Sequence, residues 1–209
     1  MTPEADPPSP PPGLPSRPPR GAPPVELQRP SMGALPSYVA ALKRGFSPDN
    51  IRGKAAADEQ LERIAQDAGA FVDMLHDPEA RGPRVKLPDG STVARLPGFS
   101  RWIWDGEFCG SIQLRWQTGT SSLPPHVLGH IGYAVAPWKR GRGYATRALA
   151  LVLPDAWQQG LDYVELTTDA DNVVSQKVIL ANGGHLLERF HKPEVYGGTE
   201  SLRWRINRD

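Results

Sequence analysis

A short turn rich in glycine and arginine is the part of this 209-residue chain best suited to hold a charged ligand. Lys139, Arg140 and Arg142 supply positive charge. Gly141 and Gly143 permit close approach to the backbone and unusual dihedral angles. The turn follows an apolar run and opens a predicted helix, whose first amides have no partner within the helix. These features predict an anion site suited to a phosphate group.

Taken alone, the turn is also compatible with a solvated loop or with an RGG-like contact to nucleic acid. The chain has 24 Lys and Arg against 23 Asp and Glu, so it lacks the positive field that drives binding to nucleic acid or to an anionic membrane. No Gly-Lys-Ser/Thr follows, and the glycine spacing differs from the dinucleotide-binding fingerprint. We therefore expect neither a P-loop nor a nucleic-acid partner.

The cysteine content restricts both the compartment and the metal chemistry. Cys109 is the single cysteine, which excludes an internal disulfide and any multi-cysteine zinc motif. It lies in a strand-like run, where a small buried thiol is expected. No apolar run approaches the roughly 20 residues that span a bilayer. We expect a cytoplasmic protein without a metal or membrane contact, either a monomer or a homodimer.

Proline content divides the chain into two parts. Of the first 36 residues 13 are proline, a composition that cannot form a packed core. We predict a disordered tail over 1–24 and one globular domain over 25–209. Residues 12–17 match the PxxPxR pattern of polyproline ligands, so an interaction protein recruited through this tail is a third class of function.

The domain itself has two patterns of secondary structure. The first half predicts helices and an antiparallel meander, with Asp-Gly turns in 88–91 and 104–107. The second half alternates strand and helix, which implies some parallel pairing. Pro154 is expected to kink or divide its helix. The expected strands are 25–28, 108–116, 130–135, 163–168, 185–190 and 201–206, and the expected helices are 32–43, 56–75, 143–159 and 171–181.

Arg140-x-x-Gly143-x-Ala145 fits the Arg/Gln-x-x-Gly-x-Gly/Ala motif of the GNAT superfamily of acyl-CoA-dependent N-acyltransferases, which the chain resembles over about 25–207. The flanking order of strand, motif, helix, strand and Asn-initiated helix is similar too, with Asn172-x-x-Ser175 at the second helix. The Pro-Gly-Phe, Trp-Asp-Gly-Glu, Gly-His-Ile-Gly-Tyr and Asn-Gly-Gly stretches look most like an uncharacterised group of predicted bacterial acetyltransferases.

This resemblance implies a mixed α+β (α/β) fold with a central, mostly antiparallel sheet flanked by helices. The sheet would be splayed between 131–135 and 163–168, with acetyl-CoA in the gap as co-substrate. The pantetheine arm would pair with the backbone of one strand, the motif amides would face the pyrophosphate, and Asn172 would contact the pantetheine. The implied cofactor residues are Tyr133, Val135, Arg140, Gly141, Arg142, Gly143, Tyr144, Ala145, Thr146 and Asn172.

The implied reaction is direct attack of a primary amine on the acetyl thioester, for which holding the reactants together is the main requirement. The alternative is a non-catalytic acyl-CoA-binding module. The amide near Tyr133 is the implied oxyanion donor. His130 and Glu165 are candidate bases, although a structural histidine and a solvent-facing carboxylate are open alternatives.

The residue that many relatives use as general acid, a tyrosine seven positions after the motif asparagine, is replaced here by Ile179. Tyr133, Tyr163 and Tyr196 are candidate replacements, and each is also compatible with a packed aromatic.

The acceptor, a small-molecule or peptide amine, would be bound by the N-terminal helices, the loop 117–129 and the region 192–199. Trp102, Trp104 and Trp116 either line this cleft or belong to the core.

Overall fold

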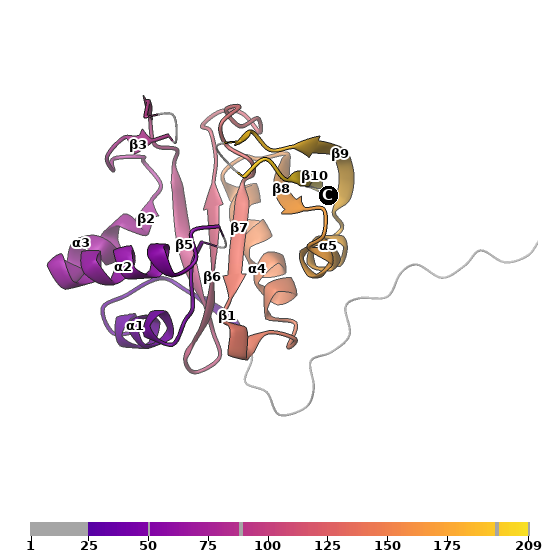
Figure 1. Ribbon diagram of the computed structural model, residues 1–209. Coiled ribbons are helices and arrows are strands. Elements are labelled where there is room, and N and C mark those ends of the chain that lie inside the picture. Colours follow the sequence, from indigo (N-terminus) through magenta and orange to yellow (C-terminus); the bar gives the residue numbers. More distant parts are fainter. Residues whose placement is uncertain (1–24, 50, 88–89, 195–196, 209) are drawn as a thin grey trace, which may run out of the picture.

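Two separate antiparallel sheets form the framework of the computed structural model, which describes residues 25–49, 51–87, 90–194 and 197–208 (Figure 1). The predicted tail over 1–24 therefore lies outside the described residues. In the first sheet the order is β1-β5-β6-β7, and β2 pairs with β5. Its strands are β1 (Glu26–Gln28), β2 (His76–Asp77), β5 (Gly98–Trp104), β6 (Phe108–Arg115) and β7 (Ile131–Val135).

The second sheet has the order β8-β10-β9 and carries the C-terminal part of the domain. A short hairpin of β3 and β4 stands apart from both sheets. The strands are β8 (Tyr163–Asp169), β9 (His185–His191), β10 (Glu200–Asn207), β3 (Val85–Lys86) and β4 (Thr92–Val93).

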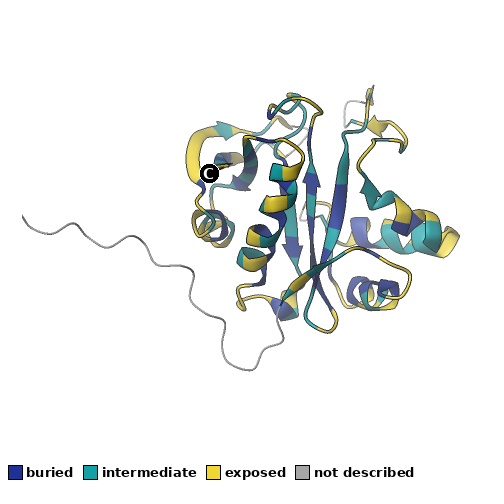
Figure 2. Cartoon of the chain, turned by 180° about the vertical axis from the view of Figure 1, so that it is seen from behind, coloured by how far each residue is buried: buried dark blue, intermediate teal, exposed yellow. Residues whose placement is uncertain are grey.

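Helices cover both faces of the first sheet, because the strands direct successive side chains to alternate faces and both faces carry apolar residues. α1 (Leu35–Lys43), α2 (Lys54–Gln66) and α3 (Ala68–Met74) lie on one face, where Trp102 stacks on Tyr38 with a centroid distance of 5.0 Å. α4 (Tyr144–Gln158) covers the other face, packing on buried Ile112 and Leu114, and the exposed positions of this helix lie on its side away from the sheet (Figure 2).

Close packing of β6 against β7 explains why residue 110 is a glycine, which the sequence pattern alone does not explain. A Cβ at Gly110 would lie 2.3 Å from the carbonyl oxygen of Ala134, so no larger residue fits there without moving β7. Cys109 next to it is buried, as predicted. This contact fixes the position of β7, the strand that leads to the glycine and arginine turn.

Two expectations about the elements are wrong, and a third is wrong in part. The single helix expected over 56–75 is two helices, because Asp67 adopts an extended conformation and its carboxylate caps α3 by accepting from the amide of Ala70 at 2.9 Å. Of the two effects expected of Pro154, a kink or a division, the division does not occur, because α4 continues through this residue. Among the strand pairs that the described residues form, all are antiparallel, so the expected parallel pairing does not extend into a ladder.

The remaining elements follow the expected order, with boundaries shifted by a few residues. The Asp-Gly turn over 104–107 joins β5 and β6, with Gly106 at a φ of 108°. The turn expected over 88–91 falls partly outside the described residues. Within the described ranges, no helix is long and apolar enough to cross a membrane.

Candidate active site

The glycine and arginine turn sits at the start of α4, as the sequence predicts. Gly141 and Gly143 both have a φ of 75°, the left-handed conformation that glycine adopts without strain. The amides from Gly141 to Thr146 donate to no acceptor within the described residues. Six adjacent amides at a helix N-terminus make a positively polarised concavity suited to an anion. We refer to residues 140–146 as the N-terminal loop of α4.

A buried ion pair fastens this loop to the β5–β6 turn. The Lys139 ammonium lies 2.9 Å from Asp105 and 2.7 Å from Glu107, and the Tyr144 hydroxyl donates to Asp105 at 2.6 Å. Burial raises the pKa of Asp105, but the hydrogen bonds from Tyr144 and Lys139 outweigh it and hold that pKa at about 2. Lys139 therefore neutralises Asp105 and Glu107, and the expectation that it offers charge to a ligand is wrong.

Arg140 also has an internal partner. Its Nε donates to the carbonyl oxygen of Val135 at 3.1 Å, which bends the chain back onto the end of β7. Arg142 is exposed at the loop surface. The Arg140 contact occupies one of the two backbone groups of Val135 that were expected to meet a pantetheine arm.

β7 and β8 meet at one end and then separate. The His130 amide donates to the Glu165 carbonyl at 2.8 Å, and the Glu165 amide donates to Nδ1 of His130 at 2.9 Å. Beyond these bonds β7 belongs to the first sheet and β8 to the second (Figure 1). His130 thus stands at the vertex of a wedge between the two sheets.

Both candidate bases are engaged at this vertex. His130 is fully buried, and burial lowers its pKa to about 4, so the ring is neutral at physiological pH. Its Nε2 is buried without a hydrogen-bond partner in the described part of the chain. Glu165 is ion-paired to Arg205 at 2.6 Å, and its side chain does not line the cleft between the sheets. These contacts favour a positioning role for both residues, and a role as base stays a prediction.

The free edge of β7 faces the wedge. Arg115 donates its amide to the His130 carbonyl, and Ala136 donates its amide to the Cys109 carbonyl, so the even-numbered residues of this stretch pair with β6. Because antiparallel pairing alternates along a strand, the backbone groups of Tyr133 point away from β6. The amide of Tyr133 is therefore directed toward the open side.

A cleft of about 290 Å³ occupies the wedge. It is lined by the backbone of β7, the end of β8, the N-terminus of α5 (Val173–Leu180) and the segment after α1. Asn172 lies at its rim, where Oδ1 accepts from the amide of Ser175 at 3.1 Å and starts α5. The side chains within reach of a ligand include Asp49, Gln113, Arg115, Tyr133, Asn172, Ser175 and Lys192.

Two hydroxyl groups inside the cleft form a pair that sequence reasoning noted only in part. Tyr133 Oη lies 2.6 Å from Ser175 Oγ. Burial raises the pKa of Tyr133 to about 12 despite this hydrogen bond, so the phenol keeps its proton at neutral pH. Ser175 was visible in the Asn172-x-x-Ser175 segment, but its proximity to Tyr133 depends on how α5 packs against β7. Ile179 is fully buried in the core.

The other aromatic candidates lie elsewhere. Tyr163 packs edge-on against His130 and beneath the guanidinium of Arg205, outside the cleft lining. Tyr196 lies outside the described residues. Trp102 and Trp116 are core residues, Trp104 packs against the core beneath α1–α3, and none of the three lines the cleft.

The comparison with known families agrees with this geometry. Residues 60–185, more than half of the chain, match the acetyltransferase (GNAT) domain family. The chain belongs to the GNAT acetyltransferases and is therefore an acyltransferase, which confirms the predicted superfamily, fold and enzyme class.

Solved structures of the same fold cover nearly the whole domain. The microcin C7 self-immunity acetyltransferase MccE, in complex with acetyl-CoA and AMP, has a TM-score of 0.56 and 12% identity over 88% of this chain and 92% of that one. The ribosomal L7/L12 α-N-protein acetyltransferase RimL, in complex with coenzyme A, has a TM-score of 0.57 and 12% identity over 88% and 93%. Mycobacterium smegmatis RimJ, in complex with CoA-disulfide, has a TM-score of 0.54 and 19% identity over 89% and 83%. At these identities the likeness is one of fold.

One curated protein shares a short stretch of sequence. The human pleckstrin homology domain-containing family A member 7 is 38% identical over 69 residues, which is 32% of this chain. The chain spans only 6% of the length of that protein, so the match carries no functional argument.

Proposed function

We propose that this enzyme transfers the acetyl group of acetyl-CoA to a primary amine by direct attack of the amine on the thioester. The observation that carries the proposal is the row of unpartnered amides from Gly141 to Thr146 at the end of β7. Such a row satisfies the oxygens of a pyrophosphate without needing a cationic side chain. That MccE and RimL have been solved with acetyl-CoA or coenzyme A supports the same cofactor here.

In this proposal the pantetheine arm binds in the wedge between the two sheets. The arm would lie along the free edge of β7, pairing with the backbone of Tyr133 and with the remaining amide of Val135, and Asn172 would contact it from the opposite side. The thioester would then stop near the vertex. The amide of Tyr133 would stabilise the oxyanion that forms when the amine attacks.

The Tyr133 and Ser175 hydroxyls protonate the departing thiolate, and the proton that the attacking amine loses restores them, so the enzyme gains and loses no net proton. Ser175 Oγ lies within hydrogen-bond reach of a phenol that stays protonated at neutral pH, so a proton can pass through either hydroxyl. This pair takes the place of the tyrosine that is absent at Ile179. His130 and Glu165 hold the vertex of the wedge and thereby position the amide of Tyr133.

Gly143→Asp tests the cofactor site. The added carboxylate would enter the same concavity as the pyrophosphate. A Cβ at Gly143 meets nothing within 4 Å, and the strain of a non-glycine residue at a φ of 75° is matched in the control below. We expect the Kd for acetyl-CoA, measured by calorimetry, to rise at least roughly tenfold, equivalent to about 1.4 kcal/mol. Gly160→Asp is the matched control: Gly160 has a φ of 81°, equally open surroundings and a position at the far end of α4. A folded Gly143→Asp protein that binds acetyl-CoA like the wild type would refute the site.

Turnover requires a separate measurement. We expect thiol release from acetyl-CoA when primary amines are supplied, and none from tertiary amines, which have no N–H proton to lose and so form no stable amide. Tight binding of acetyl-CoA without thiol release across a broad amine panel would favour the non-catalytic acyl-CoA-binding module instead.

A further inference from the structure

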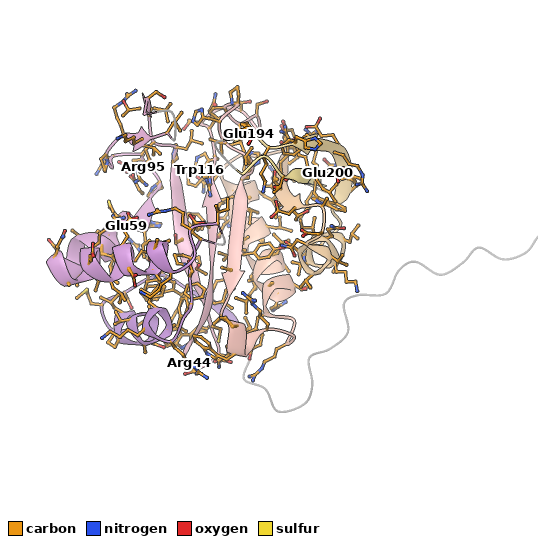
Figure 3. All side chains as sticks on the ribbon, viewed as in Figure 1. Arg44, Glu59, Arg95, Trp116, Glu194 and Glu200 are labelled. Atoms are coloured by element: carbon orange, nitrogen blue, oxygen red, sulfur yellow. The ribbon has the colours of Figure 1, made fainter. Side chains whose placement is uncertain are left out.

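Arg115 stands out among the residues of the cleft because nothing described in the chain compensates its charge. It ends β6, is half-buried, and lines both the 290 Å³ cleft and an adjoining cavity of about 530 Å³. Figure 3 shows Arg95 and Trp116 at the end of the first sheet where this second cavity lies. The Arg115 guanidinium forms no hydrogen bond or ion pair with any residue that the structure describes.

The nearby carboxylates already have partners. Asp49, which lines the same cleft, accepts from the amides of Ile51 and Arg52, and Asp77 accepts from those of Arg81 and Gly82. Asp169 is paired with Lys192, and Glu165 with Arg205. Burial accordingly lowers the pKa of Arg115, without a carboxylate to offset it. Because Arg115 is half-buried and has no ion-pair partner in the described part of the chain, its guanidinium is free to bind an anionic group that enters the cleft.

The position of Arg115 separates it from the proposed pyrophosphate site. Its Nη2 would lie 3.9 Å from a Cβ at Gly132, so the guanidinium covers the first half of β7. The N-terminal loop of α4 follows the opposite end of that strand. At about 3.3 Å per residue, the length of β7 puts the two sites more than roughly 10 Å apart. Arg115 therefore lies away from the proposed pyrophosphate site, beside the part of β7 that leads to the vertex of the wedge.

We propose that Arg115 binds the anionic group of a small acceptor, in which a primary amine and a carboxylate or phosphate are only a few bonds apart. Gly132 directly precedes Tyr133, so the guanidinium and the proposed oxyanion amide are about one residue spacing apart along β7. Gln113, two residues earlier on the same face of β6, lines the same cleft and offers a neutral hydrogen bond beside the guanidinium. This inference rests on the proposed acetyl transfer to an amine.

The test compares acceptors that differ only in the anion. β-Alanine is paired with β-alaninamide, and phosphoethanolamine with ethanolamine, so the two arms distinguish a carboxylate from a phosphate. In the wild type we expect kcat/KM for one anionic acceptor to exceed that of its neutral partner by roughly tenfold to hundredfold, as a charge-assisted hydrogen bond provides. In Arg115→Gln this preference should vanish through a higher KM, with the Kd for acetyl-CoA unchanged.

Arg101→Gln is the matched control. Arg101 is a half-buried arginine of β5 that lies over the Phe99 ring at 4.0 Å and does not line the cleft. It should keep the wild-type preference. Turnover without preference for either anionic amine, or a preference that survives in Arg115→Gln, overturns the inference and leaves acetyl transfer standing.

If no amine is acetylated, the proposed function fails and binding decides the inference separately. Calorimetry with the coenzyme A complex should then show binding of β-alanine or phosphoethanolamine that Arg115→Gln loses. Absence of such binding in the wild type overturns the inference as well.

Discussion

The N-terminal loop of α4 and the cleft between the two sheets are built from different parts of the chain. On the α4 side, the candidate pyrophosphate site consists of backbone amides within one continuous stretch, 141–146. On the acceptor side, the cleft is lined by side chains from several segments that are distant in sequence, including Asp49, Gln113, Arg115 and Lys192. A site made of backbone needs a fixed local conformation, whereas a site made of side chains needs only that the fold bring them together. The first leaves a motif in the sequence, and the second leaves none.

The largest effect is expected from a substitution in the buried ion pair beneath the N-terminal loop of α4. It tests whether this backbone site depends on a side-chain contact that is distant in sequence. Lys139→Met leaves the Asp105 carboxylate, whose side chain is 6% exposed, without its cation, so we expect the free energy of unfolding to fall by roughly 3 kcal/mol. Affinity for acetyl-CoA should fall with it, because the loop loses its anchor. Urea denaturation and calorimetry measure the two effects.

The same substitution at a surface pair serves as the control for Lys139→Met. Lys54 bonds to Asp58 within α2 with 85% of its side chain exposed, so Lys54→Met should cost under about 1 kcal/mol. Equal losses in the two variants would contradict the anchoring role.

Acid provides a second check on the buried pair. The folded pKa of Asp105 is about 2, below the unfolded value of about 3.9. The stabilisation that the Asp105 carboxylate contributes is therefore present above the unfolded value and is lost as the pH falls toward 2.

The hydroxyl pair of Tyr133 and Ser175 tests whether catalysis can be lost without loss of cofactor binding. Tyr133→Phe removes the phenol that contacts Ser175 but keeps the ring and the backbone amide. We expect kcat to fall by roughly tenfold to hundredfold while the Kd for acetyl-CoA stays near that of the wild type. Ser175→Ala should produce a similar loss, and the double variant should lose little more, because the two hydroxyls act in one path. Additive losses would instead indicate two separate roles.

His130 tests the vertex of the wedge, and its effect on stability appears only as the pH is lowered. Its folded pKa of about 4 lies below the unfolded value of about 6.5, so stability is full above the unfolded value and falls as the pH drops toward 4, by at most about 3 kcal/mol. His130→Asn, which keeps an acceptor for the Glu165 amide, should remove this pH dependence. Thermal unfolding between pH 7 and 4 measures it.

Turnover of a His130 variant distinguishes positioning from base catalysis. A base predicts that His130→Ala slows turnover more at pH 7 than at pH 9. A positioning residue that is neutral at both pH values predicts equal losses.

The sequence predicts features that depend on neighbouring residues and misses those that depend on residues far apart in the chain. The strand, turn and helix around Gly143 and the cap at Asn172 are local, and sequence reasoning placed them correctly in the fold. The break at Asp67 was missed because its flanking apolar residues continue one helical stripe. Lys139 was misjudged because Asp105, its partner, is 34 residues away in sequence. Arg115 carries no local signal, since a lone arginine at a strand end is ordinary until its surroundings are known.

Beyond the bonds between His130 and Glu165, β7 and β8 are edge strands of their sheets in the part of the chain that the structure describes. Unpaired edges are templates for the addition of another strand, and a bound pantetheine arm would protect them as a strand does. A ligand that binds only the folded state stabilises it by about 2.7 kcal/mol at a hundredfold excess over its Kd. The supply of the acyl donor would therefore govern how long each copy of the enzyme resists unfolding and aggregation.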